Sequence, residues 1–345
     1  MHEFPNSLQS KKLQPEKLNS VMNSREPILS VADLKISFSS DEGTIRAVDG
    51  VDLVVHENET VALVGESGCG KSLTALALAR LVTGPGLSLT GTIRVAGDDV
   101  LTMPEARLRA LRGATLSYIF QDPAASLNPV LRVGDQIAEV IRLHRQVPDV
   151  TAEVIRLMTL VGLPNPASRR KAYPHEFSGG MQQRVMIAMA LACQPRILVA
   201  DEPTTALDVT IQAQIFTLLS DLQSQLKMAV LLITHNLGLV ARNAARVYVM
   251  YSGRVMEAGP VAEVLGQPAH PYTKGLLAAV PRLNRPVERM IGIDGSVPHP
   301  AHLPTGCRFH PRCPLAGEVC RQREPVMEEV KEGHSVRCHY WKQPA

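Results

Sequence analysis

The spacing of apolar positions changes several times along the chain. Residues 28–38 and 48–55 have the short apolar pattern of strands, and residues 60–64 form a continuous apolar run. Such a run is typical of a strand buried on both faces of a sheet. After a glycine-rich loop, residues 72–81 have the pattern of a helix. Strands that alternate with helices predict an α/β fold.

The middle of the chain has a different pattern. Between residues 130 and 172, apolar side chains recur three or four positions apart in two successive segments, 133–141 and 150–161. This spacing predicts two amphipathic helices with no strand between them. We therefore expect a helical subdomain at about 130–180, inserted into the α/β domain. The α/β pattern resumes with predicted strands at 197–200 and 230–234.

The two ends of the chain lack this regular pattern. Residues 1–27 are polar and show no usable period, so we expect a disordered N-terminal extension, in which Met22 is an alternative start. From residue 266 onward Pro and His become frequent and the periodicity fades. We predict an α/β domain over 28–265, followed by a separate C-terminal extension over 266–345.

Composition and charge narrow the class of protein. Of 345 residues, 45% are hydrophobic, which suffices for a packed core, and the net charge of +3 is too small to indicate a nucleic-acid partner. No stretch approaches the ~20 consecutive apolar residues of a membrane helix, and the first thirty residues lack the apolar segment of a secretory signal. We expect a soluble intracellular chain that reaches a membrane only through partners.

The loop after the third predicted strand carries the strongest chemical signal. Its eight residues match the pattern G-x-x-x-x-G-K-[ST] between a strand and a helix: Gly65, Glu66, Ser67, Gly68, Cys69, Gly70, Lys71 and Ser72. The glycines let backbone N–H groups converge on phosphates, and the helix start adds its positive dipole end. Lys71 would contact the β- and γ-phosphates, and the Ser72 hydroxyl would bind Mg²⁺. The competing interpretation is a glycine turn that binds nothing.

Two carboxylates follow the apolar strand predicted at 197–200. Asp201 would hold Mg²⁺, and Glu202 would orient and polarise the water that attacks the γ-phosphate. Two acids at a strand end could instead begin a solvated turn, but the phosphate loop earlier in the chain makes the catalytic interpretation stronger.

A second anion-binding sequence, Ser178-Gly179-Gly180, stands at the start of an apolar helix. The chain already has one phosphate-binding loop, so a second phosphate-binding motif would need a second nucleotide. With this second motif, the sequence resembles the ABC ATPase family, whose signature motif contacts the γ-phosphate held by the opposite subunit. The resemblance covers about 28–265 and implies a P-loop, RecA-like core with an antiparallel β subdomain and a helical insertion.

Further motifs stand in the family's order. Gln121 matches the Q-loop glutamine, a ligand of Mg²⁺ and a catalytic residue in the family, and Asp208 matches the D-loop. His235 matches the switch histidine, a catalytic residue that the resemblance implies arranges the water and the γ-phosphate together with Glu202. Phe38 is a candidate to stack on adenine, although a buried core phenylalanine is an equal alternative. The resemblance implies an ATP-hydrolysing dimer on the cytoplasmic face of the cell membrane. Its partners would be two permease subunits and an extracytoplasmic binding protein, with no nucleic acid.

The C-terminal extension narrows the resemblance to ATPase subunits of dipeptide and oligopeptide importers. The resemblance to this subgroup rests on three segments: Pro268 to Thr273, residues 119–129, and Phe177-Ser178-Gly179-Gly180-Met181. In that subgroup the extension holds a [4Fe–4S] cluster, and its ligand positions match Cys307, Cys313, Cys320 and Cys338. From the residues alone, their spacing fits neither a zinc ribbon nor a ferredoxin run, so zinc and unmetallated thiols stay open alternatives.

The resemblance predicts a motor subunit that couples ATP binding and hydrolysis to peptide uptake. Related importers carry nickel or glutathione, which are the alternatives for the substrate. Rival functions are a soluble ABC ATPase of DNA repair or translation and a redox sensor that uses the cysteines. The sequence does not tell whether the second ATPase subunit is identical or homologous.

Overall fold

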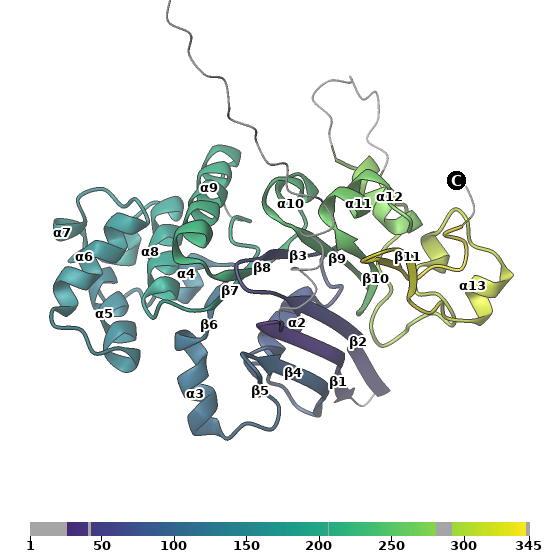
Figure 1. Cartoon of the computed structure of the whole chain (residues 1–345), viewed down its shortest axis with the longest axis horizontal. Helices are drawn as coiled ribbons and strands as arrows, with labels where there is room; N and C mark the ends of the chain where they lie inside the picture. The colour runs from purple at the N-terminus through teal and green to yellow at the C-terminus, as the bar shows by residue number, and fades with distance from the viewer. Residues whose placement is uncertain (1–25, 41–42, 206, 281–291, 343–345) are drawn as a thin grey trace, which may run out of the picture.

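Two sheets organise the residues that the computed structural model describes, which are 26–40, 43–205, 207–280 and 292–342 (Figure 1). The larger sheet has eight strands in the order β11-β12-β10-β9-β3-β8-β7-β6. These strands are β3 (Thr60–Val64), β6 (Leu116–Ile119), β7 (Ile197–Asp201), β8 (Ala229–Thr234), β9 (Arg246–Tyr251), β10 (Arg254–Pro260), β11 (Glu328–Lys331) and β12 (His334–Val336). The predicted strands at 60–64, 197–200 and 230–234 are confirmed as β3, β7 and β8.

The parallel part of this sheet brings distant loops to one edge. β3 pairs in parallel with β8 and β9, and β7 pairs in parallel with β8 and β6. Loops that follow parallel strands meet at the carboxyl edge of a sheet, which is where α/β proteins bind ligands. The loops after β3, β6, β7 and β8, which carry the predicted site residues, therefore lie together.

The smaller sheet is antiparallel, with the order β2-β1-β4-β5. It contains β1 (Leu29–Ser40), β2 (Gly43–Val55), β4 (Leu87–Val95) and β5 (Asp98–Asp99). β1 and β2 confirm the strands predicted at 28–38 and 48–55. Both sheets contribute to one buried apolar cluster, which also contains residues of α2 (Lys71–Ala77). α2 is shorter than the helix predicted at 72–81, because the chain turns where Arg80 adopts a φ of +52°.

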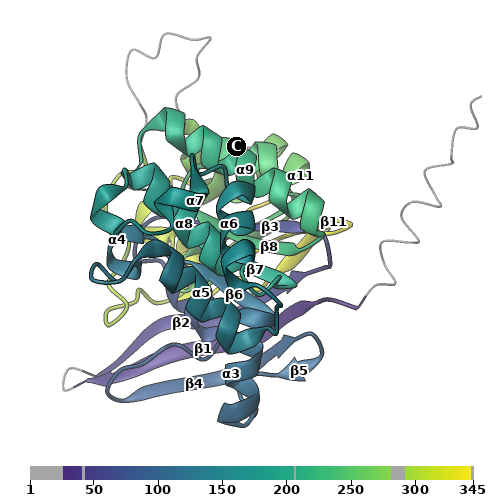
Figure 2. The same cartoon turned by 90° about the vertical axis from the view of Figure 1, so that its left-hand side faces the viewer.

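Helices form one end of the molecule, shown at the left of Figure 1 and facing the viewer in Figure 2. They are α4 (Pro123–Ser126), α5 (Val133–His144), α6 (Val150–Leu160), α7 (Pro166–Arg169) and α8 (Gly179–Leu191), with α3 (Glu105–Ala114) lying below them in Figure 1. The two amphipathic helices predicted before residue 172 are confirmed as α5 and α6. Their apolar faces join α8 in a second buried cluster that reaches β7 and β8. α9 (Val209–Leu226) packs on the same cluster.

The C-terminal residues continue the large sheet. After α10 (Leu237–Asn243), α11 (Val261–Gly266) and α12 (Pro271–Ala278), the chain forms short elements at His310–Arg312 and α13 (Glu318–Gln322) and then the hairpin of β11 and β12. β12 pairs antiparallel with β10, where Glu257 lies opposite Val336. Figure 1 shows this part at the right of the molecule. The strands of the predicted C-terminal extension thus lie in the same sheet as those of the α/β core.

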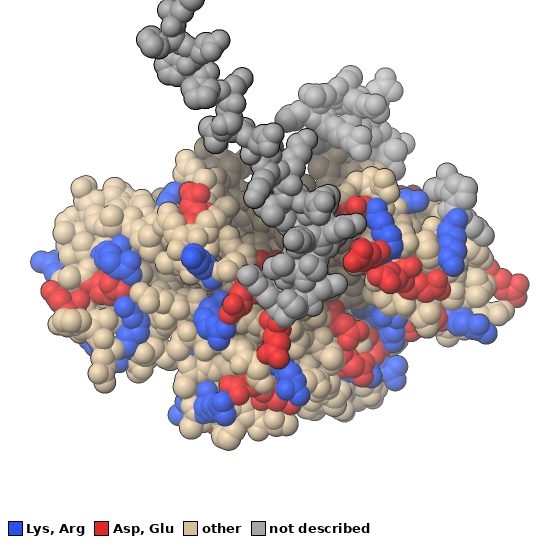
Figure 3. Space-filling model, viewed as in Figure 1, with Lys and Arg blue, Asp and Glu red and all other residues tan. Residues whose placement is uncertain are grey.

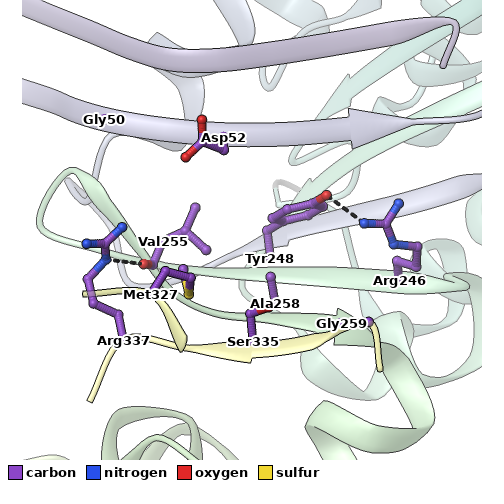
Figure 4. Close-up of a pocket in the computed structure, with 11 residues that line it drawn as sticks. Gly50, Asp52, Arg246, Tyr248, Val255, Ala258, Gly259, Met327, Ser335 and Arg337 are labelled. Atoms are coloured by element: carbon purple, nitrogen blue, oxygen red, sulfur yellow. Dashed lines mark hydrogen bonds between the residues drawn. The ribbon is translucent and has the colours of Figure 1, made fainter. Parts of the chain in front are cut away.

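A cavity of about 270 Å³ lies where the two sheets meet the hairpin of β11 and β12 (Figure 4). Asp52 of β2, Tyr248 of β9 and Arg337 after β12 line it, and no residue of the phosphate loop does. In the face shown in Figure 3, basic and acidic side chains are interspersed. Within the described residues, no helix is long and apolar enough to span a bilayer. The predicted N-terminal extension lies almost wholly outside the described residues.

Candidate nucleotide-binding site

The phosphate loop closes around Lys71. The ammonium group of Lys71, whose residue is only 5% exposed, donates hydrogen bonds to the carbonyl oxygens of Gly65 (2.8 Å) and Glu66 (2.9 Å). Gly70 precedes α2 with a φ of +104°, a conformation that glycine adopts without steric cost. The N–H groups of the first turn of a helix have no intrahelical acceptor. The loop therefore presents backbone donors and one buried cation at the carboxyl edge of β3.

Asp201, the last residue of β7, lies beside the loop. Burial raises the pKa of Asp201, and a hydrogen bond from the Ser72 side chain partly opposes that rise. The Oδ1 atom of Asp201 is buried and has no hydrogen-bond partner. A buried carboxylate oxygen without a partner is unfavourable unless a cation or a donor satisfies it. Ser72 and Asp201 thus place side-chain oxygens, the ligand type that Mg²⁺ prefers, beside the phosphate loop.

Two predicted residues lie beside the carboxylate of a third, Glu202. Its Oε2 atom lies 3.5 Å from Nε2 of Gln121 and 3.4 Å from Nδ1 of His235. Glu202 itself has a φ of +45°, a strained conformation for a residue with a long side chain, and such strain concentrates at functional sites. The structure therefore joins the loops after β6, β7 and β8 at one carboxylate.

Sequence reasoning did not single out Thr205 as a site residue. Its hydroxyl donates a 2.8 Å hydrogen bond to Oε2 of Glu202, which is the shortest polar contact of that carboxylate oxygen. The signal was present, because Thr205 begins the D-loop motif and lies three residues after Glu202. A side chain at that separation can fold back on a turn, as Thr205 does here.

The second anion-binding motif lies at the start of α8. Ser178 is the residue before the helix and makes no capping bond with its side chain, and both Ser178 and Gly179 are exposed. A Cβ atom at Gly180 would lie 2.8 Å from the Ile211 side chain, so α8 approaches α9 closely there. Asp208 caps α9 by accepting a 2.9 Å bond from the N–H of Ile211. Among the described residues, no hydrogen bond joins this motif to the phosphate loop.

Phe38 lies near the end of β1. Its ring is half-buried and packs against the main core, and a Cβ atom at Gly84 would approach it to 2.9 Å. This packing agrees with the alternative interpretation of Phe38 as a core residue. A role in stacking on adenine stays a prediction.

Two family models and many known proteins match this chain in sequence. The family model described as ABC transporter matches residues 48–205, and that of the oligopeptide/dipeptide transporter C-terminal region matches residues 256–320. The oligopeptide transport ATP-binding protein OppD of Escherichia coli (strain K12) is 48% identical over 315 residues, covering 91% of this chain and 93% of OppD. This chain belongs to the ABC transporter ATP-binding subunits of the oligopeptide/dipeptide importer family. It is an ABC-type ATPase.

Solved structures of ABC cassettes have the same fold. The dimeric cassette MJ0796 bound to ADP and Pi has a TM-score of 0.61 and 24% identity, covering 68% of this ABC subunit and 98% of that chain. CbiO1 from Clostridium perfringens, part of the transporter complex CbiONQ, has a TM-score of 0.59 and 25% identity, covering 70% and 92%. The α/β core with an antiparallel sheet and a helical subdomain is thus the ABC ATPase fold.

The four C-terminal cysteines of this ABC subunit lie near one another. All are free thiols, and the N–H of Cys307 donates to the carbonyl of Cys320 at 2.7 Å. Burial raises the pKa of Cys307 to about 12, and the charges of the other three thiols add to that rise. Charges affect one another in this way only over short distances. The fold therefore gathers four residues that are spread over more than thirty positions of sequence.

This gathering does not by itself demonstrate a metal site. Within the described part of the chain, no group of three or more His, Cys, Asp or Glu side chains is arranged to hold a metal ion. The comparisons support ATP and its Mg²⁺ but give no support for an iron–sulfur cluster. The cluster predicted from the resemblance is therefore treated below as a proposal.

Proposed function

We propose that this ABC subunit is the ATP-hydrolysing motor of an importer that takes up di- or oligopeptides across the cytoplasmic membrane. One observation carries the proposal: the loop around Lys71, Asp201 and the group around Glu202 meet at one edge of the sheet. The substrate class rests on the relative OppD, which is named an oligopeptide transport protein. Nickel and glutathione are the alternatives that an uptake assay distinguishes.

The phosphate loop would hold the triphosphate. Backbone N–H groups from Gly65 to Ser72 and the ammonium group of Lys71 neutralise the phosphate oxygens. The ammonium group of Lys71 has three N–H donors, and two of them bond the carbonyls of Gly65 and Glu66, so a donor is left for a charged phosphate oxygen. Ser72, Asp201 and Gln121 would hold Mg²⁺, which draws charge from the β- and γ-phosphates. The partnerless Oδ1 of Asp201 supports this ligand set.

Glu202 would act on the attacking water. A carboxylate that accepts a hydrogen bond from water raises its nucleophilicity and takes up its proton as the bond to phosphorus forms. The Thr205 hydroxyl and the amide of Gln121 hold Glu202 in place, and His235 faces the same oxygen. Since Glu202 is mostly buried, with 14% of its side chain exposed, few waters compete for it.

The site would be completed by a second ATPase subunit, identical or homologous. Ser178, Gly179 and Gly180 lie at an exposed helix start, as a motif that contacts a partner's γ-phosphate requires. Asp208 lies on the same side, beside the start of α9. Phe38 would stack on adenine within its own subunit. Each ATP would then lie between two chains.

Coupling to transport would run through the helical subdomain. We place residues 28–265 in the ATPase domain, about 130–180 in the helical subdomain, and 266–345 in the C-terminal extension. Gln121 joins the Glu202 site to α4 and α5, which continue into that subdomain. Two permease subunits would bind there, supplied by an extracytoplasmic binding protein. The subunit would be peripheral, at the cytoplasmic face of the membrane, and would bind no nucleic acid.

Replacing Glu202 tests the function. In the assembled transporter, Glu202→Gln is expected to bind ATP normally and to lower turnover at least ~100-fold, because an amide cannot take up the water's proton. Uptake of a labelled oligopeptide into vesicles should stop with it. Asp221→Asn, a change of an exposed acid on α9, is the matched control and should leave both activities unchanged. Near-normal hydrolysis by Glu202→Gln would refute the assignment.

We also propose that Cys307, Cys313, Cys320 and Cys338 bind a [4Fe–4S] cluster. Four thiols in one part of the extension suit iron–sulfur ligation, and a cluster would lower the cost of keeping buried thiols as thiolates. Protein purified without air should contain iron and absorb near 400 nm (roughly, for a thiolate-bound cluster). Cys320→Ser should lose the absorption, whereas Cys193→Ser should keep it. Colourless wild-type protein that contains zinc would reverse the assignment.

A further inference from the structure

An arginine of the C-terminal extension reaches the phosphate loop. The guanidinium group of Arg312 donates to both carboxylate oxygens of Glu66, from Nη1 to Oε2 at 2.7 Å and from Nη2 to Oε1 at 3.0 Å. Glu66 is the second residue of the loop, 246 positions earlier in the chain. Paired, parallel bonds of this kind fix the relative orientation of the two groups as well as their distance.

Arg312 is held on every side. Its side chain is only 4% exposed, and the Nε atom donates to the carbonyl of Asp294 at 2.9 Å. Nη2 also donates to the carbonyl of Ile293 at 3.0 Å, and Nη1 approaches the Tyr251 hydroxyl at 3.4 Å. Water screens exposed ion pairs, and the Glu66 side chain is 31% exposed, so the contact depends on the paired geometry and on the further bonds that hold the buried guanidinium group in place. Arg312 thus links Glu66 firmly to the extension.

The extension also holds the backbone of Glu66. Its N–H donates to the hydroxyl of Tyr272 at 3.0 Å, at the start of α12. Tyr272 is fully buried, and its ring packs against the rings of Tyr251 (4.7 Å between centroids) and Phe309 (5.3 Å). Such packing leaves the hydroxyl no freedom to move with the loop.

Both contacts bear on Lys71. The peptide group between Gly65 and Glu66 is planar, so its N–H and its carbonyl point in opposite, fixed directions. Tyr272 accepts from the N–H of this group, and Lys71 donates to its carbonyl. The next carbonyl, that of Glu66, is the second acceptor of Lys71. The extension therefore fixes the two carbonyls that hold the phosphate-binding ammonium group.

We propose that the C-terminal extension sets the conformation of the phosphate loop through Tyr272 and Arg312, and so sets the affinity of the subunit for ATP. The inference rests on the proposed role of this loop in ATP binding. Tyr272 and Arg312 are positioning residues, because they act through Glu66 and touch neither the phosphates nor the water. Removing either contact releases the loop and leaves Glu202 and its neighbours in place.

Two single substitutions in the full chain test the proposal. Tyr272→Phe removes one hydroxyl and keeps the ring packing, and Arg312→Gln removes the bidentate pair. We expect each to raise the Kd for a fluorescent, non-hydrolysable ATP analogue by about tenfold, the effect of one lost positioning contact. In the assembled transporter, the KM for ATP should rise while kcat at saturating ATP changes less than about twofold, since the chemistry is untouched.

Arg337→Gln is the matched control. Arg337 is another arginine of the extension; it is half-buried, donates to the carbonyls of Val255 and Pro325, and makes no hydrogen bond to the loop within the described residues. It should leave the Kd unchanged even if it lowers the thermal stability. If Arg312→Gln and Arg337→Gln lower stability equally and neither changes the Kd, Arg312 is only structural and the proposal is wrong.

A double-mutant cycle identifies the path. If Arg312 acts through Glu66, Glu66→Gln together with Arg312→Gln should weaken ATP binding no more than either change alone. Additive effects would overturn this path. If the proposed role of the loop in ATP binding is wrong, the outcome is different, because the wild-type chain itself would then not bind the analogue. Wild-type binding with an unchanged Kd in Tyr272→Phe and Arg312→Gln would refute only the role of the extension.

Discussion

At Gly65 the backbone of the phosphate loop passes close to β9. A Cβ atom there would lie 2.1 Å from the carbonyl oxygen of Met250, well inside contact distance, and 2.8 Å from the Cys69 sulfur. The peptide group that follows Gly65 is the one held by Lys71 and Tyr272. Space at this single residue therefore decides whether the loop can close around its lysine.

Gly65→Ala should accordingly disturb both stability and binding. We expect it to lower the free energy of unfolding by at least about 1 kcal/mol, because the loop must move away from β9, and to weaken ATP binding with it. Gly266→Ala is the control, since a Cβ atom there would meet nothing within 4 Å. Denaturant unfolding and analogue binding measure the two effects. Equal behaviour of the two variants would contradict this account.

The residues of the site differ in how well the sequence predicted them. Gly65 to Ser72 are consecutive, so their spacing alone identifies the loop. Glu202 and His235 follow predicted strands, whereas the strand before Gln121, β6, was not predicted; parallel pairing of the three strands explains why these residues meet. Arg312 could not be predicted, because nothing local distinguishes it from the other arginines. Its function depends on a partner 246 positions away.

At the scale of elements, α12 is joined to the sheet by a buried polar network. His270 precedes the helix, and its Nδ1 accepts from the N–H of Tyr272 at 2.9 Å. Glu257 of β10 accepts from the N–H groups of Ala269 (2.7 Å) and His270 (3.0 Å). It also pairs with Nε2 of His334 in β12 at 2.8 Å. This network fixes the helix that carries Tyr272.

Stability should therefore depend on the charge of His270. Burial lowers its pKa from 6.5 to about 3, so the folded chain keeps His270 neutral, whereas the unfolded chain takes up a proton below pH 6.5. Stability should fall as the pH drops through 6.5, by about 1.4 kcal/mol per pH unit, until pH reaches the folded pKa. Urea unfolding at pH 7.5 and 5.5 measures this loss.

His270→Asn isolates the contribution of this side chain. Asparagine also caps helices but does not titrate, so the variant should lose about 1.4 kcal/mol less than the wild type between pH 7.5 and 5.5. If the wild type and His270→Asn lose the same stability between pH 7.5 and 5.5, groups other than His270 cause the loss.

The elements of the extension were also harder to predict than those of the core. β3, β7 and β8 are continuous apolar runs because both of their faces are buried. β11 is a short and mostly polar strand at the edge of the sheet, and β12 has three residues. Neither carries the sequence alternation that reveals a strand, because backbone pairing defines them: β12 pairs with β10, and β11 pairs with β12.

For the whole molecule, residues on both sides of the boundary proposed at 265 and 266 are joined by a shared sheet and a shared core. The large sheet crosses it through β10 and β12, and a third buried cluster contains residues from both sides, among them Val64, Val249, Tyr272 and Phe309. A shared sheet and a shared core favour cooperative unfolding of the two parts. The phosphate loop comes early in the sequence, but its contacts with Tyr272 and Arg312 tie it to the extension at the other end of the chain.

The pairing of β10 with β12 also has a consequence for synthesis on the ribosome. β10 ends at Pro260, and the strand that covers its edge begins at His334, so about seventy residues must be translated in between. At a rate of roughly 5–20 residues per second, the edge stays open for several seconds or more. Open strand edges recruit other chains. A message truncated in this interval would thus yield an aggregation-prone cassette, and nascent chains need protection until the hairpin emerges.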